Sequence, residues 1–151
     1  MEKIHESILI KAPREKVWNT MLDDATYRDW TSVFNAGGSS YEGDWSEGSK
    51  MKFIGPDPET GKSGGMLARV KENRKPEFLS IEHYGIINDG VEDTTSDEVK
   101  KWVPAFENYT FTEKDGGTEV TVDVDTEKDY VTLFKDMWPK ALARLKELAE
   151  K

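Results

Sequence analysis

The chain has 151 residues, of which 30 are acidic and 21 basic, so its formal net charge is −9 at pH 7. A surface of this sign repels phosphate backbones, and we expect no binding to nucleic acid. Cysteine is absent, which excludes disulfide bonds and thiolate chemistry. The length fits one domain, and no segment is apolar enough for a membrane span or a signal peptide. We therefore expect a single cytoplasmic domain over residues 1–151, with no membrane partner.

The first third of the sequence predicts a strand, two short helices and two further strands. Isoleucines alternate along residues 3–10, which is typical of a strand with one buried face. Residues 12–21 begin with a small residue and a proline and carry apolar side chains on one helical face. A second short helix is expected over residues 24–34. Short strands are expected over residues 39–45 and 49–55, where glycines punctuate the chain.

The middle of the sequence predicts two β-hairpins. Residues 65–73 and 77–87 are the strands of the first hairpin. Residues 105–126 form the second, in which two alternating runs flank a Gly-Gly pair. The acidic, polar segment 88–102 lies between the hairpins and has a length that is typical of functional loops.

A long amphipathic helix is predicted at the end of the chain. From Asp129 onward apolar residues recur at helical spacing, and we expect one helix with a local distortion at Pro139. Because no helices separate the later strands, the sheet must be antiparallel, with the last helix over one of its faces. The predicted fold class is therefore α+β, with a curved antiparallel sheet of about seven strands around a long C-terminal helix.

Three segments carry a resemblance to a known superfamily. The stretch ILIKAPREKVWNTMLDDATYRDW (residues 8–30) resembles the opening of the START-like, or SRPBCC polyketide cyclase, superfamily, in which a strand leads into two short helices. MWPKALARLKELAE (residues 137–150) resembles its terminal helix, and ENYTFTEKDGGTEVTV (residues 107–122) its last hairpin. The most similar branch is the set of small bacterial proteins related to the activator of the heat-shock-protein-90 ATPase. The resemblance covers nearly the whole chain and implies the helix-grip fold.

The same resemblance implies a cavity, but it does not select one function. The superfamily includes lipid and hormone binders, polyketide cyclases, ring-hydroxylase subunits and co-chaperone domains, and fold alone does not decide among them. Its members share a cavity between the sheet and the long helix. Our first expectation is a binding protein for a small apolar or aromatic molecule, without a cofactor. The alternatives are a module that stimulates a heat-shock ATPase, with a chaperone as partner, and an enzyme of the cyclase or aromatase kind.

Hairpin register predicts which side chains face this cavity. If Gly116 and Gly117 form the turn of the last hairpin, Tyr109 and Phe111 lie opposite a run of valines on the inner face. Glu107 shares their parity and is expected to point inward as well.

The earlier hairpin raises the question of His83. A turn over residues 73–76 places Met66 opposite His83 and directs the imidazole inward. A slip of one residue would reverse the faces of this strand and send the alternate set inside, namely Phe78, Tyr84 and Ile86. We favour the first register because it aligns apolar residues with apolar residues.

His83 lies near the end of its strand and Glu107 near the start of the next, so antiparallel pairing would bring the two together. Such a pair could orient a polar group of a ligand or make the imidazole a general base. The alternative is that the two residues only satisfy each other, or bond to Tyr109 or to a buried water. We favour ligand contact over catalysis and assign no catalytic residue.

Aromatic side chains complete the predicted site. Trp30 and Phe53 are expected at the mouth of the cavity, Trp102 in a lid beside the acidic segment, and Phe134 and Trp138 on the inner side of the long helix. For each ring, packing in the core is the alternative. Two histidines on separate strands and no cysteine give no metal-ligand pattern. The predicted ligand-binding residues are thus His83, Glu107, Tyr109, Phe111, Trp102, Phe134, Trp138, Phe53 and Trp30.

Overall fold

The structure, a computed structural model, describes residues 2–34, 38–56 and 63–151. Within these ranges eight strands form one antiparallel sheet in the order β1-β8-β7-β5-β4-β3-β2, with β6 paired to β5. The strands are β1 (Glu2–Ile10), β2 (Ser40–Glu42), β3 (Lys50–Pro56), β4 (Ser63–Arg74), β5 (Phe78–Asn88), β6 (Val91–Asp93), β7 (Ala105–Lys114) and β8 (Gly117–Thr126). The expected curved sheet is confirmed, with the short β6 as an additional strand.

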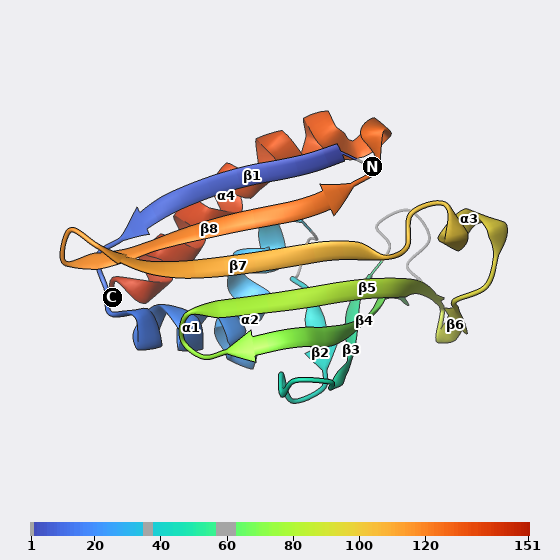
Figure 1. Cartoon of the computed structure of the whole chain (residues 1–151), viewed down its shortest axis with the longest axis horizontal. Helices are drawn as coiled ribbons and strands as arrows, with labels where there is room; N and C mark the ends of the chain where they lie inside the picture. Colours follow the sequence, from blue (N-terminus) through green and yellow to red (C-terminus); the bar gives the residue numbers. More distant parts are fainter. Residues whose placement is uncertain (1, 35–37, 57–62) are drawn as a thin grey trace.

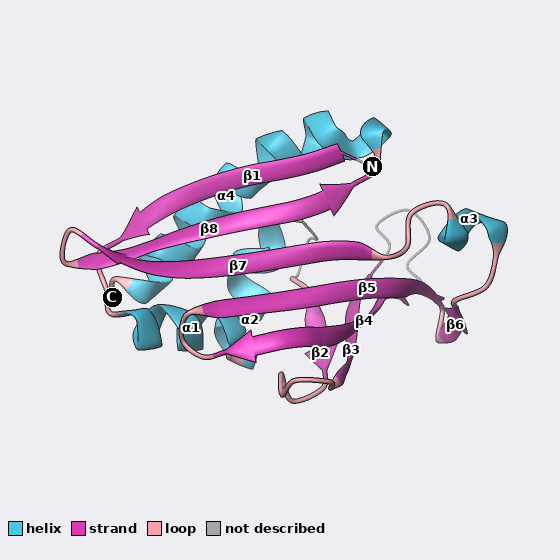
Figure 2. Cartoon of the chain, viewed as in Figure 1, coloured by secondary structure: helices cyan, strands magenta, loops and turns pink. Residues whose placement is uncertain are grey.

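Three of the four α-helices lie on one side of this sheet, as Figures 1 and 2 show. They are α1 (Arg14–Leu22), α2 (Asp24–Trp30) and the long α4 (Val131–Ala149). The short α3 (Asp97–Lys100) instead lies beyond the end of β5, next to β6. No helix in the described ranges combines the length and the hydropathy that a membrane crossing requires.

The turn between β7 and β8 consists of Asp115 and Gly116, whose φ angles are 52° and 80°. Both residues adopt the left-handed conformation that a two-residue hairpin turn requires, and Asp-Gly is a preferred pair for it. The expected Gly116-Gly117 turn is therefore wrong by one residue. Because moving the turn by one residue moves each cross-strand partner by two, Tyr109 pairs with Val122 and still faces inward.

The register between β4 and β5 is interrupted by a bulge directly after His83. Ala68 pairs with His83 and Leu67 with Gly85, so Tyr84 is an extra residue in β5. A bulge of this kind bends its strand and reverses the alternation of the side chains beyond it. The side chains of β5 before and after the bulge therefore follow different parities.

The long helix α4 is continuous through Pro139, as expected. Its C-terminal half is held in the core by Ala141, Leu142, Leu145 and Ala149, all buried. In its N-terminal half only Trp138 is buried. Because proline has no N–H group, the carbonyl of Lys135 lacks its usual partner in the helix. The helix thus has a well-packed half and a half that contributes one large ring to the interior.

The short helices pack against the sheet and against α4. Trp18, which was expected in the core, is 4% exposed, and its ring lies 5.2 Å from that of Phe111. Asp29 of α2 accepts two hydrogen bonds from the guanidinium of Arg144 on α4, at 2.6 and 2.9 Å. These contacts fix α1 and α2 against one end of the inner face, and a space is left between α2, the sheet and the first half of α4.

Candidate functional site

That space is a cavity of about 480 Å³, a volume within the usual range for small-molecule sites. Its inner wall consists of buried side chains, among them Met21, Tyr27, Trp30, Tyr109 and Trp138. Its rim consists of exposed or half-buried side chains, among them Glu98, Trp102, Glu127, Tyr130 and Phe134. The cavity therefore runs from an aromatic interior to an acidic and aromatic rim.

The rim lies where two neighbouring strands separate. β5 and β7 pair only as far as His83, which is opposite Ala105. Beyond this point β5 pairs with β6 instead, and the chain passes through α3 before it enters β7 (Figure 1). This excursion carries Glu98 and Trp102 to the rim. His83 thus stands at the point where the sheet opens.

A polar cluster of three residues interrupts the apolar wall. His83 Nε2 lies 3.1 Å from Glu107 Oε1, and the Tyr109 hydroxyl donates a hydrogen bond to Glu107 Oε2. An ionised carboxylate only accepts hydrogen bonds, so the imidazole donates from Nε2. His83 Nδ1 is buried and has no hydrogen-bond partner among the described residues. Glu107 is therefore held at both oxygens in a fixed orientation.

Two tyrosines, Tyr109 in this cluster and Tyr27 next to it, have raised pKa values. Burial raises the pKa of the Tyr109 phenol well above its ordinary value of 10.0, and the negative charge of Glu107 adds to the effect. Burial likewise raises the pKa of the Tyr27 phenol, with a further contribution from Glu107. Both phenols are therefore hydroxyl groups at neutral pH, and that of Tyr109 donates its proton to the hydrogen bond with Glu107.

Aromatic rings form a connected wall around the cluster. The Phe53 ring lies 5.9 Å from the imidazole of His83, and the Trp138 ring lies 6.2 Å from that of Tyr109. Tyr27 links the two sides, since its ring makes an edge contact with Trp30 at 5.5 Å and a tilted contact with Phe53 at 6.2 Å. Ring pairs at these distances add to the stability gained by burial.

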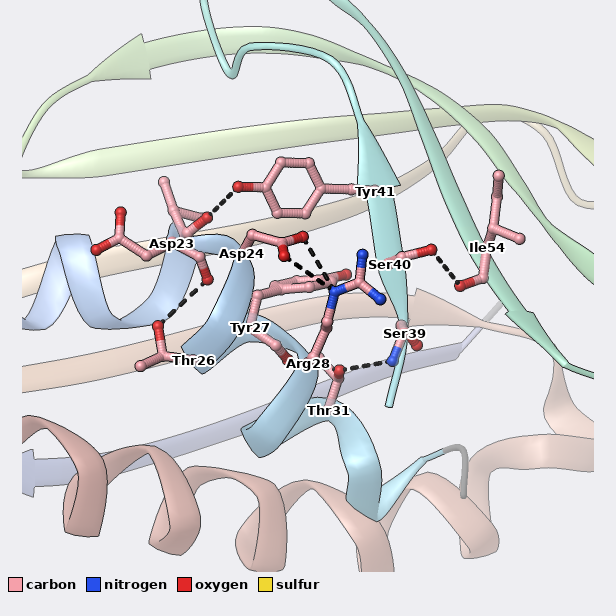
Figure 3. A network of polar contacts seen from close by, with 11 residues as sticks. Asp23, Asp24, Thr26, Tyr27, Arg28, Thr31, Ser39, Ser40, Tyr41 and Ile54 are labelled. Atoms are coloured by element: carbon pink, nitrogen blue, oxygen red, sulfur yellow. Dashed lines mark hydrogen bonds and ion pairs between the residues drawn. The ribbon is translucent and has the colours of Figure 1, made fainter. Parts of the chain in front are cut away.

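The position of Tyr27 is stabilised by hydrogen bonds from Tyr41 of β2 and from Ser39, just before β2, to residues on either side of α2, as Figure 3 shows. The Tyr41 hydroxyl donates to the carbonyl of Leu22 at 2.6 Å, and the amide of Ser39 donates to Thr31 Oγ1 at 3.0 Å. Tyr41 also packs edge-on against Tyr27, with ring centroids 5.2 Å apart. The segment around β2 is thereby bound to the residues that precede and follow α2.

Eight of the nine predicted site residues line the cavity, namely His83, Glu107, Tyr109, Trp102, Phe134, Trp138, Phe53 and Trp30. Phe111 does not. It is 2% exposed and packs against Trp18, because it lies nearer the β7–β8 turn, where α1 covers the sheet. Alternation along β7 gives the correct face for Phe111 but not its depth along the strand. A role in ligand contact stays a prediction for the other eight residues.

The observed register of β4 and β5 differs from both expected registers, because Arg74 already pairs with Phe78 at the turn and because Lys71 and Tyr84 are extra residues. The pairing of His83 with Met66 is wrong, since Met66 lies opposite Ile86. Beyond the bulge Ile86 joins His83 in the cavity wall, although the two were assigned to alternative faces. Tyr84 and Phe78 instead lie under arginines, with guanidinium carbons 4.4 and 5.0 Å from the ring centres.

Several wall residues were not among the predicted site residues. Tyr27 could have been found from its spacing, since it lies three residues before Trp30 on the same face of α2. Glu98 and Glu127 carry no such signal, because they lie in segments without a regular alternation. Among the described residues no three His, Asp or Glu side chains gather as ligands of a metal ion would.

An antiparallel sheet that holds a long C-terminal helix across an internal cavity defines the helix-grip, START-like class of proteins. Within this class, the chain belongs to the family described as activator of Hsp90 ATPase homolog 1-like proteins, whose family model matches residues 11–150. A search of curated proteins finds no match to the chain.

Solved structures with the same fold come from several bacteria. A protein from Nitrosomonas europaea is 15% identical, with a TM-score of 0.72 over 97% of this chain and 92% of that one. The Aha1 dimer from Colwellia psychrerythraea is 18% identical, with a TM-score of 0.71 over 99% and 97%. CalU16 from Micromonospora echinospora is 17% identical, with a TM-score of 0.65 over 97% and 75%. At these identities the likeness establishes the fold alone.

Proposed function

We propose that the chain binds a small hydrophobic or aromatic molecule in the cavity between the sheet and α4. One observation carries the proposal: a cavity of about 480 Å³ has largely aromatic walls that converge on a single polar cluster. Ligand sites combine apolar walls with a few placed polar groups in this way, because burial supplies affinity and hydrogen bonds fix orientation.

The walls and the cluster would have different roles. Trp30, Phe53 and Trp138 would cover the apolar body of the ligand, and Phe134 and Trp102 would close over it at the rim. The cluster of His83, Glu107 and Tyr109 would hold one polar group of the ligand. Glu107 is the member best placed to do so, because its side chain is 22% exposed, compared with 11% for His83.

The proposal is tested by nuclear magnetic resonance titration of isotope-labelled protein with fatty acids, sterols, flavonoids and polyketide-like aromatics. A ligand of the cavity shifts the indole signals of Trp102 and Trp138. The indole of Trp18 is the internal control, since it packs against Phe111 outside the cavity wall. If no compound shifts the cavity signals, or if Trp18 shifts as much as Trp138, the proposal is wrong.

The family match favours a second candidate function, the stimulation of a heat-shock ATPase through contact with a chaperone. Such contact uses a surface rather than a cavity. Tyr130 and Leu133, at the start of α4, are 50% and 48% exposed and provide apolar side chains next to each other on one surface. A reconstituted assay with heat-shock protein 90 tests this candidate. Stimulation that is lost in the double variant Tyr130→Ser, Leu133→Ser would support it, and an unchanged ATPase rate would reject it.

A further inference from the structure

The charges around the cavity indicate the charge of its ligand. Resting on the proposed function, we infer that the ligand is an organic cation, an apolar or aromatic molecule that carries a protonated amine or a quaternary ammonium group. Four carboxylates line the cavity, from Glu98, Glu107, Asp125 and Glu127. No lysine or arginine lies in the described part of the wall.

Glu107 is the carboxylate in the interior. Glu107 accepts a hydrogen bond from Tyr109 and lies 3.1 Å from His83 Nε2, but in the described ranges no lysine or arginine pairs with it. A carboxylate in a partly desolvated site is stabilised by an opposite charge far more than in water. An ammonium group at this point completes the site, whereas an anionic ligand would bring a second negative charge next to Glu107.

The rings beside Glu107 favour the same ligand chemistry. Phe53 and Trp138 flank the cluster on its two sides, through their contacts with His83 and Tyr109. The face of an aromatic ring carries partial negative charge and attracts cations, most strongly for tryptophan. A cationic head group at Glu107 would therefore lie among rings, and the apolar body of the ligand would fill the remaining aromatic space.

The rim adds an electrostatic filter. Asp125 is compensated, since it accepts hydrogen bonds from the Lys3 ammonium at 2.8 Å and from the amide of Phe106 at 3.0 Å. In the described part of the chain, the side chains of Glu98 and Glu127 have no hydrogen-bond or ion-pair partner. Their uncompensated charge gives the mouth a negative potential, which attracts cations and slows the entry of anions.

The test uses three probes that share one 4-(biphenyl-4-yl)butyl skeleton and differ at its end, which is an ammonium, a hydroxyl or a carboxylate. Binding is measured by calorimetry at low salt, and the site by the Trp138 indole signal. We expect the amine to bind about tenfold or more tightly than the alcohol, and the acid to bind most weakly. The variant Glu107→Gln removes the charge and keeps the shape of the side chain. It should abolish the preference for the amine over the alcohol, a ratio that does not depend on any loss of affinity that the two probes share.

Glu113→Gln is the matched control, because Glu113 lies on the same strand with a side chain that is 75% exposed, away from the cavity. This variant should keep the preference of the original protein. If the alcohol or the acid binds as tightly as the amine, or if the preference survives in Glu107→Gln, the inference is overturned while the proposed function stands. If none of the three probes binds, both are overturned. The comparison of the three probes on the unsubstituted protein tests the inference even where the Gln variant is unstable.

Discussion

His83 Nε2 lies 3.1 Å from Glu107 Oε1, although 24 residues separate the two in the chain. They meet because β5 and β7 are antiparallel neighbours, with Ile81 opposite Glu107 and His83 opposite Ala105. The contact is therefore a diagonal one on the inner face of the sheet, a spacing that long side chains can span. Tyr109 holds the second carboxylate oxygen, so the orientation of Glu107 is determined from both sides.

Replacing Glu107 with alanine should destabilise the protein in the absence of any ligand. His83 and Tyr109 would both lose their partner, and we expect the free energy of unfolding to fall by about 1 to 3 kcal/mol. Glu107→Gln keeps an acceptor and should lose less. Chemical denaturation measures the difference. Glu113→Ala, at a residue near the turn end of the same strand whose side chain is 75% exposed, is the control and should stay within about 0.5 kcal/mol. A loss for Glu107→Ala no larger than that for Glu113→Ala would show that the cluster does not stabilise the fold.

Truncation of Trp138 should destabilise the protein. It is 5% exposed, and its ring contacts that of Phe34 at 4.9 Å and that of Trp30 at 6.2 Å. We expect Trp138→Ala to lower the free energy of unfolding by about 3 kcal/mol, the lower end of the usual range, because one side of the ring already faces open space. Thermal unfolding measures this loss. Leu133→Ala, at a residue that is 48% exposed on the same helix, should change the free energy of unfolding little. A loss below about 1 kcal/mol for Trp138→Ala would contradict this account.

The buried phenols of Tyr27 and Tyr109 should make the folded state less stable in alkaline solution. The pKa values of Tyr27 and Tyr109 are raised in the folded state by burial, above the value of about 10 that the unfolded chain has. Their contribution is therefore complete below pH 10 and decreases as the pH rises above it, because only the unfolded chain then releases the phenol protons. An ultraviolet titration should show part of the phenolate signal appearing only with unfolding. Tyr27→Phe and Tyr109→Phe should each remove some of that late signal. Complete ionisation while circular dichroism still reports a folded protein would refute the prediction.

The ion pair between Asp29 of α2 and Arg144 of α4 should stabilise the fold at neutral pH, and this stabilisation should be lost in acid. The hydrogen bonds from Arg144 lower the pKa of Asp29 below its ordinary value of 3.8. The stabilisation is therefore present above pH 3.8 and is lost as the pH falls through the lower value of the folded state. We expect Asp29→Asn to flatten the dependence of the unfolding temperature on pH in this window. Asp24→Asn, which removes a pair with Arg28 inside α2, is the control and should leave the slope in place.

Pro139→Ala should stabilise the protein. Alanine supplies the amide that the Lys135 carbonyl lacks, and Pro139 is exposed, so no packing is lost. We expect a gain of about 1 to 3 kcal/mol in the free energy of unfolding. We expect the amides of residues 131–138 to exchange faster than those of 141–149 in the original protein and to become better protected in the variant, which hydrogen exchange measures. A loss of stability would mean that the proline is needed for the path of the helix.

The fold could be predicted because its signals are local and repeated. The alternation of Val120, Val122 and Val124 and the helical spacing of Leu142 and Leu145 each define a buried face without knowledge of the partner. The resemblance of the opening segment and of the last helix to a known superfamily then supplied the arrangement. The short strand β6 could not be predicted, since one valine and two acidic residues pair there only because β5 continues past the end of β7.

The candidate site could be predicted only in part, because the lining of a cavity depends on how far along its strand each residue lies and on where the strands carry bulges. Alternation predicted that His83 and Glu107 share one face of the sheet, and antiparallel pairing of successive strands predicted that they are neighbours. The structure brings the two side chains together. The extra residue at Tyr84 has no signal in the sequence, since a bulge is a property of two strands and not of one. Phe111 shows the other limit, because the same alternation serves a ring in the core and a ring in the cavity wall.

The proline in α4 divides the helix into parts with separate tasks. Residues after Pro139 hold the sheet, and those before it contribute Phe134 and Trp138 to the cavity. Apart from Trp138, the residues of α4 before Pro139 can therefore be varied with little cost to the packing that maintains the fold. A library of substitutions confined to these residues is the shortest route to a chain of the same architecture with a new specificity.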